Sequence, residues 1–233
     1  MKTSLPIKNK LKQMKNIIIF LIVIIVFFSL AAKAQVQVSQ EPAHIKVFEN
    51  KYLRLLDVWL QPGDTTLFHI HSTPSIFLEF TSTEVCIQLK GTEWKKSRNK
   101  EGNASYRSYA NDTLVHRVSN CDTVRFHVTD VELLSSWKPN TILQLLPFTL
   151  LFDNERAVAY KLTQSSFNNQ IISNRGPMVA QLVSGDEVMY YDAKKKKSVR
   201  IKAGKYLYIE PGTSFYFSAK DNEDINLVLF EIK

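Results

Sequence analysis

Two histidines one residue apart, His69 and His71, are the residues whose types and spacing most directly predict chemistry in this chain. Side chains at positions i and i+2 of a β-strand point to the same face, so both imidazoles can reach one metal ion. A third histidine, His116, lies in a short apolar segment, 114–118, that is also typical of a strand. A metal centre exists only if these three imidazoles converge.

The two remaining histidines are predicted to take no part in such a centre. His44 precedes the first clear strand pattern, so we expect it on the surface. His127 alternates with apolar residues in the segment 124–128 and shares its parity with Arg125. That parity predicts that His127 lies on the polar face of a strand.

The elements that would position these histidines are β-strands. Past residue 40 the apolar segments are short, rich in Val, Ile, Phe and Tyr, and bounded by Gly, Pro, Asn, Asp or Ser, which indicates antiparallel β-structure. No segment of eleven residues or more has a convincing helical period, apart from a short turn near 133–137. The expected strands are 53–60, 76–80, 85–89, 105–109, 115–118 and 124–131 in a first set, and 157–162, 179–183, 188–191, 199–202, 206–209, 215–217 and 227–232 in a second.

The two sets of strands resemble each other in sequence. Segment 47–50 (Val-Phe-Glu-Asn) matches 151–154 (Leu-Phe-Asp-Asn), and two further short matches follow in the same order, 83–85 with 186–188 and 131–133 with 230–232. Nearly constant offsets indicate an internal duplication. We therefore expect two tandem β modules that meet near residues 137–147, where Pro139 and Pro147 are typical of a linker.

The first 34 residues have the pattern of an export signal. Five lysines precede an apolar run from Ile17 to Phe28, and Ala32-Lys33-Ala34 is typical of a signal-peptidase site. We expect a signal peptide at 1–34 that is cut after Ala34, and a periplasmic or extracellular protein without a membrane contact after cleavage. An uncleaved anchor is the alternative, although the run is shorter than the ~20 residues of a spanning helix.

The positive charge of the chain belongs mostly to this signal. Residues 1–34 hold six lysines and no acid, so the formal net charge of +8 falls to +2 for the remainder. The cluster Lys194 to Lys197 lies between two short strands, as expected of a solvated turn. Nucleic acid is therefore not an expected partner.

Cys86 and Cys121 are the only cysteines. Export permits a disulfide between them, and two buried thiols are the alternative.

Around its histidines the chain resembles the cupin superfamily. The first cupin motif has a glycine, five residues and then His-x-His, and here Gly63 precedes His69 at that spacing. His116 and Asn120 match the end of the second motif. The resemblance implies an all-β fold of two tandem cupin barrels, double-stranded β-helices of the jelly-roll type, at 35–138 and 139–233. In the second barrel Phe215 stands in the histidine position, which implies a degenerate, metal-free barrel.

The resemblance implies His69, His71 and His116 as ligands of one divalent ion of Fe, Mn, Ni, Cu or Zn, with open positions for water or substrate. Thiol and diketone dioxygenases of the superfamily use such a set. The usual family glutamate is missing, because Ser75 and Ile76 occupy its place. Glu79 has the parity of the histidines but lies about 13 Å beyond Ser75 along a strand, which makes it a poor substitute.

Aromatic and polar neighbours of the histidines are candidates for a substrate-binding lining, although filling of the barrel is the alternative interpretation. Arg107 and Arg117 lie next to candidate lining residues. If the side chain of either arginine points into the barrel, it can bind an anionic ligand; if it points outward, it faces solvent. The candidates for the lining are Trp59, Phe68, Ser75, Phe77, Tyr106 and Tyr109.

Two functions follow as expectations. The first is an exported bicupin that binds a divalent metal and a small organic molecule in its N-terminal barrel, as a metal-dependent oxygenase, with no catalytic acid or base assigned. The alternative is a non-catalytic protein that binds or senses a small molecule. The intact histidine spacing favours the first, and the missing glutamate favours the second. A homodimer paired through strand edges is one expected assembly.

Overall fold

The computed structural model describes Asn16 and residues 35–139, 144–167, 170–220 and 224–233. The predicted signal segment, 1–34, lies outside these residues except for Asn16. Residues 36–233 form one compact unit. Within the described part of the chain, no helix has both the length and the apolar character that crossing a membrane requires.

The first ten strands form an N-terminal barrel of two five-stranded sheets. One sheet has the order β1-β4-β9-β6-β7 and the other the order β2-β3-β10-β5-β8. All pairings are antiparallel except the short parallel pair of β1 and β4. The strands are β1 (Val36–Gln37), β2 (His44–Glu49), β3 (Leu53–Leu60), β4 (His69–His71), β5 (Ser75–Glu79), β6 (Glu84–Leu89), β7 (Lys95–Arg98), β8 (Ala104–Arg107), β9 (Leu114–Asn120) and β10 (Phe126–Leu133), with the 3-10 helix η1 (Val38–Gln40) between β1 and β2.

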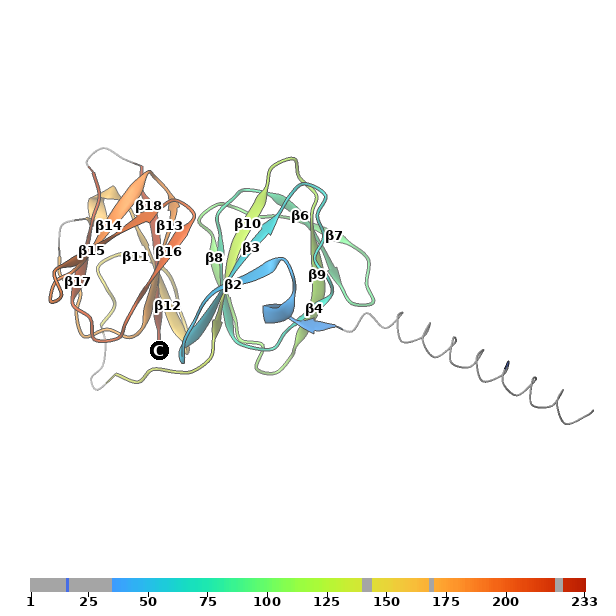
Figure 1. Cartoon of the computed structure of the whole chain (residues 1–233), viewed down its shortest axis with the longest axis horizontal. Coiled ribbons are helices and arrows are strands. Elements are labelled where there is room, and N and C mark those ends of the chain that lie inside the picture. Colours follow the sequence, from blue (N-terminus) through green and yellow to red (C-terminus); the bar gives the residue numbers. More distant parts are fainter. Residues whose placement is uncertain (1–15, 17–34, 140–143, 168–169, 221–223) are drawn as a thin grey trace, which may run out of the picture. The chain divides into compact units, whose positions relative to one another are not determined.

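The last eight strands form a C-terminal barrel, drawn from yellow to red in Figure 1. Its sheets have the orders β11-β12-β18-β13-β16 and β15-β14-β17. The strands are β11 (Thr149–Asp153), β12 (Ala157–Leu162), β13 (Met178–Ser184), β14 (Glu187–Asp192), β15 (Lys197–Lys202), β16 (Lys205–Ile209), β17 (Phe215–Ser218) and β18 (Asn226–Ile232), with the 3-10 helix η2 (Gln164–Ser166) after β12. The chain passes from one barrel to the other between β10 and β11, and the predicted boundary at residue 138 within that connection stays a prediction.

The internal duplication is visible in atomic detail at the start of each barrel. β2 and β11 are edge strands of equivalent five-stranded sheets, and each carries a register shift, after Lys46 in one and after Leu150 in the other. The turn that follows is also repeated: the Asn50 side chain accepts hydrogen bonds from two backbone N–H groups, and Asn154 does the same 104 positions later. The sequence match at 47–50 and 151–154 therefore reflects one repeated bulge and turn.

The expected strands are all present, β4 holds the His69 and His71 pair that was assigned to a strand, and four further strands, β1, β2, β7 and β11, were not predicted. β2 and β11 were missed because the bulge interrupts their alternation of apolar and polar residues. β7, Lys-Lys-Ser-Arg, is entirely exposed and has no apolar residue, so no periodicity could reveal it. Lysines on an edge strand prevent pairing with another chain, which explains this composition.

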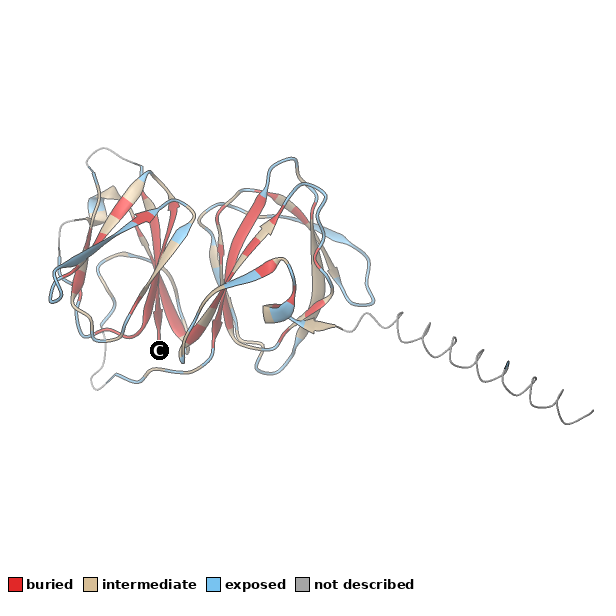
Figure 2. Cartoon of the chain, viewed as in Figure 1, coloured by how far each residue is buried: buried red, intermediate tan, exposed pale blue. Residues whose placement is uncertain are grey.

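A shared core joins the two barrels. It combines buried side chains of β3, β5 and β10 with buried side chains of β12, β13 and β18. Of these strands, β10, β12, β13 and β18 are buried along nearly their whole length (Figure 2). Thr129 donates a hydrogen bond to Gln181 across the junction, at 2.9 Å. The interior of the C-terminal barrel is a separate core that includes Tyr160, Tyr190, Phe215 and Phe217. That barrel is filled with side chains.

A disulfide connects Cys86 of β6 to Cys121, directly after β9. It joins neighbouring strands of the sheet that also contains β4. The structure thus decides between the two alternatives left open for these cysteines, in favour of the bridge.

Candidate metal centre

Strand β4 places His69 and His71 inside the N-terminal barrel, where 0% and 2% of their surfaces are exposed. Because β4 pairs with β9 in a register that sets His69 opposite His116, the third predicted histidine joins them. The ring centroids of His69 and His116 lie 4.6 Å apart, and those of His71 and His116 lie 5.0 Å apart. The structure thus brings together the three residues that the sequence singled out.

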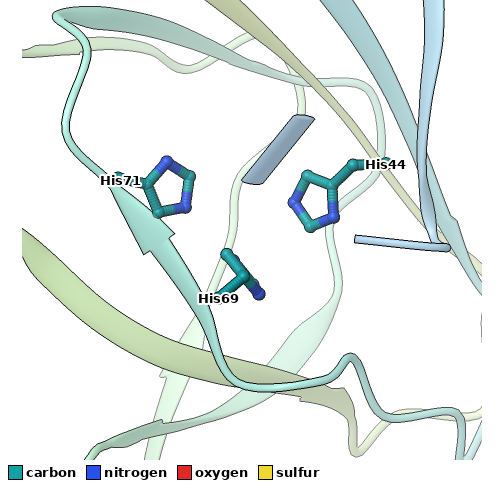
Figure 3. A group of neighbouring side chains, drawn as sticks. All are labelled: His44, His69 and His71. Carbon is teal, nitrogen blue, oxygen red and sulfur yellow. The ribbon is translucent and has the colours of Figure 1, made fainter. Parts of the chain in front are cut away.

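A fourth histidine, His44, completes the cluster, and the prediction that it lies on the surface was wrong. It begins β2, is only 9% exposed, and its ring centroid lies 4.6 Å from that of His69. One possible ligand atom from each of His44, His69 and His71 lies within 4.8 Å of the others. Figure 3 shows these three imidazoles around a common space. Sequence reasoning missed His44 because a lone histidine before an interrupted strand carries no spacing signal.

Hydrogen bonds fix two of these rings by their Nδ1 atoms. His44 Nδ1 lies 2.7 Å from Glu41 Oε2, and His69 Nδ1 lies 2.9 Å from the carbonyl oxygen of Leu67. Both acceptors require a proton on Nδ1, so Nε2 carries the free lone pair. Histidines that bind metals are commonly oriented in this way by a carboxylate or a backbone carbonyl. His69 Nε2 is buried without a hydrogen-bond partner among the described residues.

His71 and His116 complete the arrangement. His71 Nδ1 faces Asp130 Oδ2 at 3.4 Å, and its Nε2 lies 3.0 Å from His116 Nε2. Two nitrogens bound to one metal ion at about 2.1 Å, at a right angle, are also separated by about 3 Å. The two carboxylate oxygens of Asp130 are buried and accept no hydrogen bond from the described residues. Asp130 is therefore a second carboxylate, after Glu41, placed behind a ring of the cluster.

Burial keeps His69 and His116 in the neutral form. Burial, and then the neighbouring histidines, lower the pKa of His69 to about 3 and that of His116 to about 2. The imidazole must be unprotonated to bind a metal, so these two rings are in the required form at neutral pH. Neutral nitrogen donors and a buried, unpartnered Nε2 fit a divalent transition metal. They do not fit Ca²⁺ or Mg²⁺, which bind oxygen ligands.

A cavity of about 560 Å³ adjoins the four histidines. Phe77 and Tyr109, two of the predicted lining residues, face it: the Phe77 ring centroid lies 5.7 Å from that of His71, and Tyr109 stacks on His71 at 5.4 Å. Tyr109 has a φ of 51°, a left-handed conformation that is uncommon for a residue with a side chain. Such backbone strain is often found at functional sites.

Four other residues predicted for the lining do not line this cavity. Phe68 alternates with His69 and therefore points to the opposite face of the sheet, where it packs against Arg117. Tyr106 alternates with Arg107 and donates a hydrogen bond to Glu155, ahead of β12. Ser75 is fully buried and donates a hydrogen bond to the carbonyl oxygen of Thr73. Trp59 lies beside His127, on the outer face of β3.

Glu79 does line the cavity, as its parity with the histidines suggested. Its carboxylate accepts a hydrogen bond from the Asn99 side chain at 2.7 Å. Burial outweighs this bond and raises the pKa of Glu79 to about 7. A carboxyl group with that pKa can both give and take a proton near neutral pH. Its hydrogen bond to Asn99 does not connect it to any of the four histidines.

His127 is buried, so its assignment to a polar, solvent-facing surface was wrong. Only 2% of it is exposed; its ring lies between Trp59, at 3.4 Å, and Phe80, at 4.3 Å between centroids. Its Nε2 bonds to Asp57 at 2.7 Å. The parity was read correctly, but Gly204 of the C-terminal barrel lies against this ring and helps to cover it. His127 is on the outer face of β10 and outside the histidine cluster.

Comparisons with known proteins identify the architecture. No family model and no curated protein matches the sequence. Solved structures do match, among them the Ylba protein from E. coli, with a TM-score of 0.56 and 10% identity over 88% of this chain and 95% of that one. A cupin 2 conserved barrel domain protein from Leptotrichia buccalis matches with a TM-score of 0.52 and 10% identity over 89% of this chain and 94% of that one.

This chain has the cupin fold. A mutant of the salicylate 1,2-dioxygenase from Pseudoaminobacter salicylatoxidans matches as well, with a TM-score of 0.52 and 11% identity over 78% of this chain and 70% of that one. At such identities the likeness shows the fold alone. In this cupin fold the histidine cluster lies in the N-terminal barrel. Phe215 is 1% exposed within the apolar core of the C-terminal barrel, where the sequence placed it in the histidine position.

Proposed function

We propose that the N-terminal barrel binds one divalent transition-metal ion, Fe, Mn, Ni, Cu or Zn, through His69, His71 and His116, with His44 as a fourth ligand. A small organic molecule binds in the adjoining cavity, and the protein acts as a metal-dependent enzyme of the oxygenase type. One observation carries the proposal: the Nδ1 atoms of three rings face hydrogen-bond acceptors, so their Nε2 atoms are left for a shared ion.

A bound metal supplies a Lewis acid with open positions for an oxygen or carbonyl group. The residues of this chain supply the surroundings. Phe77 and Tyr109 form a wall beside His71 and exclude water from that side of the centre. Glu79, with its pKa near 7, is the group in the cavity that can hold or release a proton on its carboxylate oxygen.

The alternative is a non-catalytic cupin that binds or senses a small molecule. It is favoured by Ser75, which replaces the family carboxylate and uses its hydroxyl for a hydrogen bond to Thr73. Oxygen uptake separates the two functions. The iron-loaded enzyme consumes O₂ when a substrate binds, whereas a sensor binds the same molecule without consuming O₂.

Export is part of the proposal. The chain is cut after Ala34 and works in the periplasm or outside the cell, without a membrane contact and without nucleic acid, as a monomer or a homodimer. The disulfide between Cys86 and Cys121 supports this, since disulfides persist in oxidising compartments.

The test is metal content. The chain from Gln35 is reconstituted with each of the five metals and analysed by elemental analysis, beside His44→Ala, His69→Ala and His116→Ala. We expect one ion per chain in the wild type and loss of the ion from His69→Ala and His116→Ala. His44→Ala reports whether the fourth ring is a ligand, by a fall in affinity.

The matched control is His127→Gln, which alters the one histidine outside the cluster and should keep the metal. Thermal melts of each metal-free variant separate loss of ligands from loss of fold. If the folded wild type binds none of the five metals stoichiometrically, the proposal is wrong.

A further inference from the structure

Arg107 brings a positive charge to the cavity beside the histidines. It lies on β8, the edge strand of its sheet, and pairs with Ser75 of β5. Its strand parity is that of Ser105, and both residues line the cavity. His116 and Tyr109 line the same cavity as Arg107. Within the described part of the chain, no carboxylate forms an ion pair with Arg107.

Arg117, the other arginine singled out in the sequence, has a different environment. Its guanidinium lies between the rings of Phe68 and Trp94, at 4.7 and 4.8 Å from their centroids, and donates a hydrogen bond to Gln88. It does not line the cavity. The two arginines therefore form a natural pair of test and control.

Tyr109 adds a hydroxyl donor next to Arg107. Tyr109 lines the cavity together with Arg107, and a phenol hydroxyl is a hydrogen-bond donor at neutral pH. The stacking of its ring on His71 fixes it at the edge of the metal centre. A guanidinium and a phenol side by side are the donors that a carboxylate accepts from.

The rest of the cavity is mostly apolar. Its walls include Phe77, Val85, Phe126 and Val128, and Lys95 stands with other polar residues among the lining. Acidic residues also line it: Asp130 lies against His71, Glu79 is bonded to Asn99, and Glu93 is exposed to solvent. Lys96 also lines the cavity, but it lies on the exposed strand β7 and is paired with Glu84. An apolar wall with cations at its polar side suits a ligand with an apolar body and a single negative end.

We propose that the organic molecule bound in this cavity is a small monocarboxylate, with its carboxylate held by Arg107 and Tyr109 and its apolar body against Phe77 and the valines. This inference rests on the proposed function, because it names the class of molecule that binds beside the metal. It assigns Arg107 the role of a specificity-determining residue.

The experiment is calorimetric titration of the metal-loaded chain from Gln35 with two acids, benzoate and hexanoate, and with their neutral amides. We expect at least one acid to bind about ten to one hundred times more tightly than its amide, because the charge-assisted hydrogen bonds are lost in the amide. Arg107→Gln should remove most of this preference. Tyr109→Phe should weaken binding of the acid about fivefold, and Arg117→Gln should bind as the wild type does.

Metal content is measured for every variant, which separates the two proposals. Equal binding of acids and amides, no binding of either acid, or unchanged binding by Arg107→Gln would overturn the inference while leaving the metal centre standing. A folded wild type without metal overturns the proposed function instead. Titrations of that metal-free protein still show whether Arg107 confers a preference for the acids over their amides, since Arg107 is not a metal ligand.

Discussion

Glu41 and His44 form a buried pair in which the carboxylate oxygen Oε2 lies 2.7 Å from the imidazole Nδ1. The same carboxylate accepts hydrogen bonds from the backbone N–H groups of Ala43 and Leu67. Because Leu67 lies two residues before His69, Glu41 ties the start of β2 to the approach of β4. One side chain therefore positions two of the four histidines.

Glu41→Gln should lower metal affinity about tenfold, because an amide orients His44 less firmly than a carboxylate and makes its ring less basic. The measurement is competition with a chromophoric chelator. Glu49→Gln is the control, since Glu49 forms ion pairs at the surface with Lys46 and Arg54. Equal affinities for both variants would show that the pair has no role in holding the metal.

Reduction of the disulfide should destabilise the fold. The bond closes a loop with a sequence separation of 35 residues, which corresponds to about 3–4 kcal/mol from the entropy of the unfolded chain. The double variant Cys86→Ser, Cys121→Ser should therefore unfold at lower urea concentration than the wild type. The wild type with a reductant should match the double variant. A midpoint that neither change moves would contradict this role of the bridge.

The stability of the metal-free protein should fall on acidification. His69 and His116 have pKa values of about 3 and about 2 in the fold, below the ordinary 6.5. Between pH 6.5 and about 3 the unfolded chain binds more protons, so the free energy of unfolding decreases as pH falls, by at most about 1.4 kcal/mol per unit for each histidine. Urea denaturation with a chelator measures this slope.

Glu79 should oppose that slope in part. Its pKa is about 7 in the fold against 4.5 in the unfolded chain, so between these values the folded state binds more protons and stability falls as pH rises. Because the effect of one carboxyl group opposes that of two histidines, the free energy of unfolding still decreases as the pH falls. Glu79→Gln should steepen the slope and His116→Gln should flatten it; the reverse order would refute the assignment.

The two barrels should unfold together, because one buried cluster includes side chains of both. Leu182→Ala, in the separate core of the C-terminal barrel, should cost about 3 kcal/mol. It should also lower the urea midpoint reported by the fluorescence of Trp59 and Trp94, which belong to the N-terminal barrel. An unchanged fluorescence midpoint beside a shifted circular-dichroism midpoint would mean that the barrels unfold separately.

Local sequence determined the strands and the three-histidine part of the site. The period of a strand puts His69 and His71 on one face whatever surrounds them, and the apolar segment of His116 supplied a partner strand. The repeated bulge and Asn turn were visible as a sequence match, because each is made by neighbouring residues. These features depend on contacts within a few positions along the chain.

Tertiary structure decided what lies on each side of the strands. His44 joins the cluster only because pairing brings the start of β2 and the approach of β4 together, and His127 is buried by contact with the other barrel. Because neighbouring residues of a strand point to opposite faces, Arg107 and Tyr106 lie on different faces, and so do Arg117 and His116. Which of these faces lines the cavity depends on how the sheets close into a barrel. Sequence determined the parity of each side chain, and only the packing of the barrels decided which parity faces the metal centre.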